Sequence, residues 1–139
     1  MIGAIVAKRK ARSGFDALSR HDLDKFLADW ADDATFIYPG DLPVSGEIEG
    51  KEAIREWFRK FMDQFPLSSF TVRNICVQNI FAFGGTNVLA VEWDVKLTNR
   101  DEEEIENSGV TTISLKRGKA ILVRDYIFDS EAAKRGWGG

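Results

Sequence analysis

The sequence contains little cysteine, histidine or proline, and it has no long apolar run. One cysteine, Cys76, among 139 residues leaves no partner for an internal disulfide. One histidine and one cysteine are too few for the His/Cys ligand sets of zinc sites. No apolar stretch approaches the about 20 residues that a membrane-spanning helix needs. These absences exclude a disulfide scaffold and argue against a zinc site or a membrane span.

The charge balance gives no reason to expect a nucleic acid or a membrane surface as partner. The chain has 19 Lys and Arg against 22 Asp and Glu, which gives a net charge of −3. Its length predicts a single domain over residues 1–139, large enough to bury a core. The sequence has no glycine-rich phosphate loop, nucleophile elbow or metal motif, so we expect no cofactor and no metal.

The first residues, MIGAIVAKRKARSG, do not have the order of a signal peptide. Their apolar part is short, and the basic residues follow it instead of preceding it, so we expect a cytoplasmic protein. The basic residues fit either the solvated face of a first helix or a nucleic-acid patch. The acidic remainder of the chain favours the solvated face. These residues are Lys8, Arg9, Lys10 and Arg12.

The spacing of the apolar residues changes at Pro66. Before it, they recur at helical spacing, with Asp22 as an N-cap and Pro66 as a helix end. After it, apolar and polar residues alternate, as in half-buried strands. The sequence predicts helices over about 4–19, 23–30 and 51–65, and residues 1–13 form the N-terminal segment in which the first helix starts. It predicts strands within 35–38, 70–85, 86–99, 110–119 and 120–129.

Helices that precede strands in this way predict an α+β fold. We expect three helices in the N-terminal half to cap a strongly curved antiparallel sheet, so that the two form a cone with a pocket at its mouth. Turns are expected at Gly84-Gly85 and at Arg117-Gly118-Lys119, and residues 130–139 are expected to form a flexible tail.

The stretch FLADWADDATFIYPGD, which starts at Phe26, changes from helical spacing to a short aromatic strand that ends at Pro39-Gly40. Asp32 and Asp33 lie at the change. Aspartate suits turns because its carboxylate bonds the local backbone. We therefore interpret both residues as structural.

The order of elements and three short segments resemble a known superfamily. The segments FLADWADDATF, GKEAIREW and GKAILVRDYIFD are similar to those of nuclear transport factor 2-like proteins, over roughly residues 14–130. Within the superfamily, the SnoaL-like cyclases, steroid delta-isomerases and limonene-epoxide-hydrolase-like proteins are the most similar groups. The resemblance implies the cone-shaped fold, and it is weak evidence for any one reaction because this fold hosts many functions.

Two opposite faces are predicted for the strand that begins at Val88. One reading places the face with Glu92 and Asp94 in solvent and the other face in the core. The resemblance to epoxide-hydrolase-like proteins implies the reverse: Glu92 and Asp94 point into the pocket, and the apolar face lies outside, where two chains would pair. The faces are Val88, Ala90, Glu92, Asp94 and Lys96 against Leu89, Val91, Trp93, Val95 and Leu97.

Asp125 stands between Val123 and Ile127 on one face of the last strand. A carboxylate on an apolar face needs a partner, a shifted pKa or access to solvent. The resemblance implies a catalytic aspartate at this position, and the alternative is a hydrogen-bonded carboxylate with a structural role.

Tyr38 shares a face with Phe36, and the resemblance places that face toward the cone. In the delta-isomerases the proton-shuttling acid would stand at Tyr38, the oxyanion tyrosine at Gly14 and the oxyanion acid at Thr111. All three are replaced here. The acid–arginine–acid set of the epoxide hydrolases is also incomplete, because Glu92 stands where the arginine would be.

Three function classes remain open. The first is a cofactor-free isomerase, cyclase, dehydratase or hydrolase that acts on a small apolar substrate, with Asp125 as base, Asp94 as its partner and Tyr38 as hydrogen-bond donor. The second is a ligand-binding module without turnover, and the third is a structural dimer. Whether the protein is an enzyme is left open. The partners we expect are a small apolar molecule and a second copy that binds through the outer sheet face. The further residues expected in the pocket are Glu92, Phe36, Trp57, Phe61 and Thr111.

Overall fold

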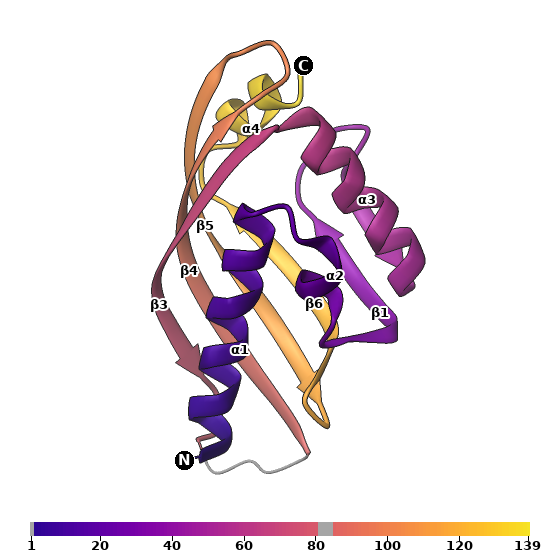
Figure 1. Cartoon of the computed structure of the whole chain (residues 1–139), viewed down its shortest axis with the longest axis vertical. Coiled ribbons are helices and arrows are strands. Elements are labelled where there is room, and N and C mark those ends of the chain that lie inside the picture. The colour runs from indigo at the N-terminus through magenta and orange to yellow at the C-terminus, as the bar shows by residue number, and fades with distance from the viewer. Residues whose placement is uncertain (1, 81–84) are drawn as a thin grey trace.

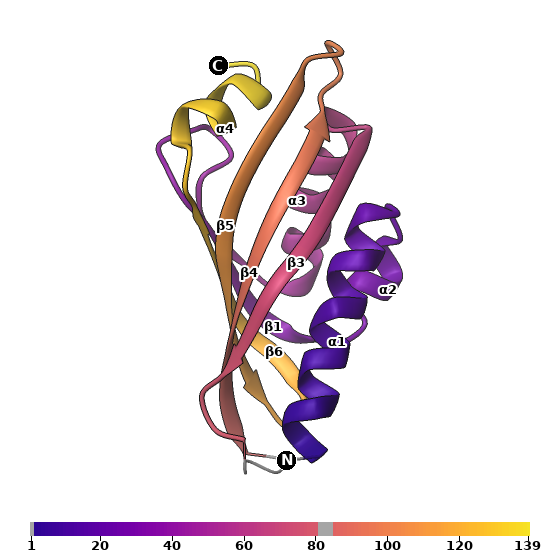
Figure 2. The same cartoon turned by 90° about the vertical axis from the view of Figure 1, so that its left-hand side faces the viewer.

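A bent six-stranded sheet carries three helices on one face, and a short fourth helix lies at one end (Figures 1 and 2). This arrangement is seen in a computed structural model that describes residues 2–80 and 85–139. In that part of the chain the elements are α1 Ile2–Ser19, α2 Leu23–Leu27, β1 Trp30–Tyr38, β2 Gly46–Glu49, α3 Lys51–Gln64, β3 Leu67–Val77, β4 Thr86–Thr98, β5 Glu104–Lys116, β6 Lys119–Ile127 and α4 Ser130–Gly136.

The sheet has the order β2-β1-β6-β5-β4-β3 and is mixed. The last four strands form antiparallel hairpins in chain order, as the alternating segments after residue 66 predict. Strand β1 instead pairs in parallel with β6. The α+β class and the curved sheet are confirmed, but the sheet is not antiparallel throughout. Alternation reports which residues share a face, and it carries no information on strand direction.

Helix α1 packs along the inner face of the sheet, against β3. Small residues on its buried side, such as Ala7 and Ala11, allow the helix to approach the sheet closely. The hydroxyl of Ser19 joins the two elements, because it donates to the Phe15 carbonyl at 3.1 Å and accepts from the Phe70 amide at 3.0 Å.

The second predicted helix is shorter than expected. Asp22 caps it as predicted and accepts from the Lys25 amide at 3.2 Å, but the helix ends at Leu27. Trp30, predicted on the helix, begins β1. The cause is strand pairing: the carbonyl of Asp29 accepts from the Ala120 amide at 2.8 Å, which brings the chain to the edge of β6.

The acidic pair Asp32 and Asp33 lies exposed within β1, at an irregular stretch of its pairing with β6. The pair therefore lies at a bulged strand and not at a turn, and its structural role stays a prediction.

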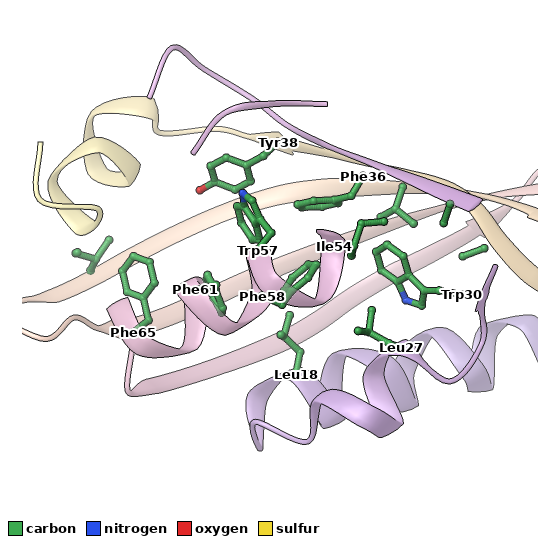
Figure 3. Packing of buried hydrophobic residues seen from close by; sticks show 14 of the residues in the cluster. Leu18, Leu27, Trp30, Phe36, Tyr38, Ile54, Trp57, Phe58, Phe61 and Phe65 are labelled. Atoms are coloured by element: carbon green, nitrogen blue, oxygen red, sulfur yellow. The ribbon is translucent and has the colours of Figure 1, made fainter. Parts of the chain in front are cut away.

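Helix α3 carries an apolar face that closes the core. Ile54, Trp57, Phe58 and Phe61 are buried on one side, and the helix ends just before Pro66, as predicted. The ring of Trp57 contacts two aromatic side chains of β1: the ring centres of Phe36 and Tyr38 lie 4.9 and 4.8 Å from its own (Figure 3).

The C-terminal segment differs from the flexible tail that the sequence predicts. Residues Ser130–Gly136 form helix α4, which Asp129 caps by accepting from the Ala132 amide at 3.0 Å. The ring of Trp137 then packs against Phe65, with centres 5.1 Å apart.

Two turns were predicted between strands. The turn at residues 117–119 is present, and Arg117 and Gly118 both have positive φ, as expected for a tight hairpin. Of the predicted turn at Gly84-Gly85, Gly84 lies outside the described residues.

Candidate functional site

The interior holds a cavity of about 550 Å³ between the sheet and the helices. This volume lies in the range of small-molecule sites, which is about 300–1,000 Å³. Aromatic rings form much of the wall. They belong to Phe15, Phe26, Trp30, Phe36, Tyr38, Trp57, Phe58, Phe61, Phe65, Phe70, Trp93 and Trp137.

Asp125 is the acidic group of the inner wall. It stands on β6 directly opposite Thr111 of β5. The Thr111 hydroxyl donates to Asp125 Oδ1 at 2.6 Å and accepts from the Trp93 indole N–H at 2.8 Å. This chain of two hydrogen bonds fixes one carboxylate oxygen. Within the described residues, the other oxygen has no hydrogen-bond partner, so it is free to meet a ligand.

The surroundings of Asp125 favour its neutral form. Burial raises the pKa of its carboxyl to about 6, and the hydrogen bond from Thr111 opposes this change. At neutral pH the group is therefore mostly ionised, and its proton affinity is well above that of an ordinary aspartate. Such a group can accept a proton and release it again.

Tyr38 lies beside Asp125. The parallel register pairs Phe36 with Val123 and Ile37 with Arg124, so the next step along both strands brings Tyr38 and Asp125 together. Burial raises the pKa of the Tyr38 phenol, the Trp137 hydrogen bond lowers it, and the negative charge of Asp125 raises it further. The phenol therefore stays protonated at every physiological pH.

Trp137 holds the ring of Tyr38. Its indole N–H donates to the Tyr38 oxygen at 2.9 Å. Because that oxygen acts as an acceptor, the phenolic proton remains available to a second group. Tyr38 also lines the cavity, so its phenol can donate a hydrogen bond to a group there.

The structure places Asp94 and Glu92 outside the cavity, which corrects the prediction that both line it. Asp94 accepts from Ser108 Oγ at 2.7 Å and from Arg73 Nε at 2.5 Å. These two hydrogen bonds, that from Ser108 first, lower the pKa of Asp94. Glu92 accepts from Asn74 Nδ2 at 2.7 Å on the same outer face. Asp94 is therefore no partner for Asp125.

The opposite face of β4 is the buried one. Helix α1 covers it within the same chain, through Ala7 and Ala11. The apolar strip therefore gives no argument for a dimer. Strand alternation predicted the two sets correctly, and the family resemblance gave the wrong orientation. The buried set is Leu89, Val91, Trp93 and Val95.

Four of the five further residues expected in the pocket line the cavity: Phe36, Trp57, Phe61 and Thr111. Gly14, which stands where a functional tyrosine of the delta-isomerases would be, also lines it. A Cβ at Gly14 would meet no atom within 4 Å, so part of the cavity is the space in front of this glycine.

The sequence did not predict that Trp93 holds Thr111 in place. Trp93 stands opposite Gly109, and its ring lies over that glycine to reach Thr111. A Cβ at Gly109 would be 2.7 Å from the Trp93 ring and 2.3 Å from the Tyr126 carbonyl oxygen. A lone glycine inside a strand signals such a close approach, so Gly109 was the available clue.

Trp137 was also missed, because the sequence predicts a flexible tail at this position. Within the described part of the chain, no group of three or more His, Cys, Asp or Glu residues is placed to hold a metal ion. No described helix is long and apolar enough to cross a membrane.

A comparison with protein families decides where this fold belongs. The model of the SnoaL-like domain matches residues 11–123. The chain belongs to the SnoaL-like family. The matched segment includes Tyr38 and Thr111 and ends two residues before Asp125.

Several solved structures have a similar fold and align with nearly the whole length of this SnoaL-like chain. An NTF2-like protein of unknown function from Burkholderia pseudomallei has a TM-score of 0.79 at 17% identity, over 96% of this chain and 98% of its own. A candidate isomerase from Bacillus subtilis has a TM-score of 0.80 at 23% identity, over 96% and 93%. TerC, crystallised with polyporic acid, has a TM-score of 0.77 at 15% identity, over 96% and 98%.

At these identities the neighbours show the fold alone, which is the nuclear transport factor 2-like fold. Among curated proteins, none matches the sequence.

Proposed function

We propose that this SnoaL-like protein binds a small, mostly apolar molecule in its cavity and moves a proton within it, with Asp125 as the base. The observation that carries the proposal is the position of Asp125: an acid with one free oxygen, a pKa of about 6 and an aromatic wall around it. An acid in this setting can take a proton from carbon next to a carbonyl group, because it combines ionisation at neutral pH with raised proton affinity.

The proposed reaction uses two residues. Asp125 removes a proton from the carbon beside the ligand carbonyl. The electron pair of that C–H bond forms a C=C bond to the carbonyl carbon, and the π pair of the C=O bond moves to the oxygen. The phenolic proton of Tyr38 then forms a hydrogen bond to the negative oxygen. Where the ligand has a C=C bond one carbon further on, the electrons flow back from the oxygen and Asp125 gives the same proton to the far end of that C=C bond. This shifts the C=C bond into conjugation with the carbonyl and restores the carboxylate. Thr111 and Trp93 orient the base.

A single acid supports proton transfer better than epoxide opening. Hydrolysis of that type would use a second acid and an arginine beside Asp125, and Asp94 and Glu92 lie on the other face of the sheet. The fold neighbour TerC was crystallised with polyporic acid, which supports a small organic molecule as ligand.

The test measures hydrogen exchange at carbon. The protein is incubated in D₂O with 2-tetralone, whose protons beside the carbonyl are acidic, and deuterium uptake is followed by NMR. We expect exchange above the buffer rate, and Asp125→Asn should remove it, because a general base contributes about 10²–10⁴-fold. Asp94→Asn is the matched control, with the same substitution on the outer face, and it should leave the rate unchanged.

The alternative is a binding module without turnover, favoured by the absence of a second acid beside Asp125 among the described residues. The two functions separate in the same experiment. Thermal stabilisation by 2-tetralone without Asp125-dependent exchange supports the binding module. If 2-tetralone and a wider set of enones and lactones give neither stabilisation nor exchange, both the catalytic and the binding function are overturned.

We also propose that two copies pair through the outer face of the sheet. This face is the one opposite the buried strip of β4. It combines apolar and small polar side chains of β4, β5 and β6 with the charged residues Glu92, Asp94 and Arg124. The uncharged ones are Val88, Ala90, Val110, Thr112, Leu122 and Tyr126.

A further inference from the structure

The cavity has a second polar region, far from Asp125. Lys10 of α1, Lys25 of α2 and Asp29, which precedes β1, all line the cavity and are exposed to solvent. This exposed part, where the cavity opens at the surface, is called the mouth below. Lys10 Nζ lies 3.6 Å from Asp29 Oδ1, so the two residues face each other across elements.

A third cation lies close to the mouth. Lys119, at the start of β6, donates from Nζ to the carbonyl oxygen of Ala28 at 3.2 Å. Asp29 is thus the acidic residue that the described cavity wall has at the mouth, where Lys10 pairs with it and Lys119 bonds the residue before it. The neighbouring Asp24 is held by Arg55, with N and O atoms 2.7 Å apart. Among the described residues Lys25 makes no ion pair, so the mouth carries an excess of positive charge.

The mouth and the base are separated along one strand. The Asp29 carbonyl accepts from the Ala120 amide, which places the mouth at Ala120 of β6. Asp125 stands five residues further along the strand. At about 3.3 Å per residue, the distance between them is roughly 16 Å. A ligand that reaches both ends must be elongated.

The two ends have opposite preferences for charge. An anionic group placed beside Asp125 would meet a second negative charge in an apolar wall, which is costly. At the mouth the same group would meet Lys10 and Lys25 and keep part of its hydration. The cavity therefore orients an amphipathic ligand, with its charged end outward.

We propose that the ligand is an elongated apolar molecule with one anionic group, such as a carboxylate, which Lys10 and Lys25 bind at the mouth while the apolar end reaches Asp125. The proposal rests on the proposed function and names the class of its ligand. Asp29 competes for Lys10 in the empty cavity, so the anion displaces Asp29 from this ion pair.

The test compares dodecanoate with dodecanamide, which differ in charge and hardly in shape, at about pH 8 and below micelle-forming concentrations. Isothermal titration calorimetry gives both Kd values. Partly exposed ion pairs contribute modest energies, so we expect the carboxylate to bind about fivefold to tenfold more tightly than the amide. Added salt should reduce this ratio, because the mouth is open to solvent.

Three variants make the test specific. Lys25→Met should reduce the ratio to about twofold or less while dodecanamide binds as before. Asp29→Asn should increase the ratio, because it frees Lys10 and removes the repulsion between the Asp29 and ligand carboxylates. Replacement of a residue with a purely structural role would not have this effect. Lys8→Met is the control: Lys8 is on the same helix as Lys10, exposed and outside the cavity wall, and it should leave the ratio unchanged.

The outcomes separate the two proposals. Equal affinities of the two probes, or an unchanged ratio in Lys25→Met, overturn the anionic ligand and leave the binding cavity in place. If neither probe binds and 2-tetralone gives no stabilisation either, the proposed function fails and this inference fails with it.

Discussion

Asp125 links the proposed chemistry to the stability of the protein. Its carboxyl has a pKa of about 6 in the folded chain, against an ordinary value of 3.8, because burial disfavours the charged form. Between these two pH values the folded state holds more protons than the unfolded state. The contribution of Asp125 to the free energy of unfolding is therefore largest below about pH 4. It falls as the pH rises from about 4 through 6.

Asp125→Asn should remove this loss of stability. The amide can still accept from Thr111, and it has no charge to desolvate, so above about pH 7 we expect the variant to be more stable by about 1–3 kcal/mol. Urea unfolding at pH 5 and pH 8 measures the effect, which should be larger at the higher pH.

Asp94→Asn is the control for the sign of that effect. The pKa of Asp94 is lowered by the hydrogen bonds from Ser108 and Arg73, so its ionised form stabilises the fold and its replacement should give no gain at pH 8. A gain of equal size in both variants would show that a general reduction of negative charge, and not the burial of Asp125, is the cause.

Part of the site could be predicted from single residues. Asp125 between Val123 and Ile127 predicts a buried acid, since alternation places all three on one face. The orientation of Glu92 and Asp94 could not be predicted in this way. Alternation separates two faces and does not say which of them a helix covers. Ala7 and Ala11 of α1 pack against the apolar face of β4, but nothing in their local spacing names the strand that they contact.

At the scale of elements, helix α4 changes the role of Tyr38. The segment from Asp129 onward has a cap at Asp129 and one large aromatic residue, Trp137, among small and charged residues. A helix of seven residues is too short to be stable by itself. It forms because Trp137 packs on Phe65 and donates to Tyr38. Local sequence patterns carry no signal of this tertiary contact, and they therefore predict a flexible tail.

Two substitutions at Trp137 separate packing from hydrogen bonding. Trp137→Ala should lower the free energy of unfolding by about 2–4 kcal/mol, because a large partly buried ring is lost. Trp137→Phe keeps most of the packing, so its loss should be near 1 kcal/mol. In the exchange assay, both should slow the reaction, because the Tyr38 ring loses the donor that holds it.

Chemical denaturation gives the two free energies, and Trp137→Phe is the informative variant for function. If its exchange rate equals that of the unchanged protein, the indole N–H does not position Tyr38, and α4 has only a structural role.

At the scale of the whole molecule, the sheet order explains why distant residues form one site. Pairing of β1 with β6 places Tyr38, from the first third of the chain, beside Asp125 near its end. The helices before residue 66 and the hairpins after it could be predicted, since each depends on local spacing. The parallel pairing depends on contacts between segments about 90 residues apart, for which a single sequence gives no pattern.

The outer face of the sheet is left uncovered by the chain's own helices. Leu122 and Tyr126 are exposed by 38% and 43%, and Val110 lies between Glu92 and Tyr126 in the register. A partner chain would cover these side chains, and a stable pair buries about 800 Å² on each copy. Arg73 and Asp94 would then lie at the polar edge of the interface.

We therefore expect light scattering at micromolar concentration to give the mass of a dimer. Val110→Lys places a charge in the middle of the outer face, where a second copy would have to desolvate it, so the variant should be monomeric at the same concentration. Ala53→Lys is the matched control, because it adds the same charge on the exposed side of α3 and should leave the dimer intact. Both variants should still unfold in one cooperative thermal transition, which shows that the chain itself is folded. A monomer for the unchanged chain would overturn the pairing and leave the cavity as a complete site within one chain.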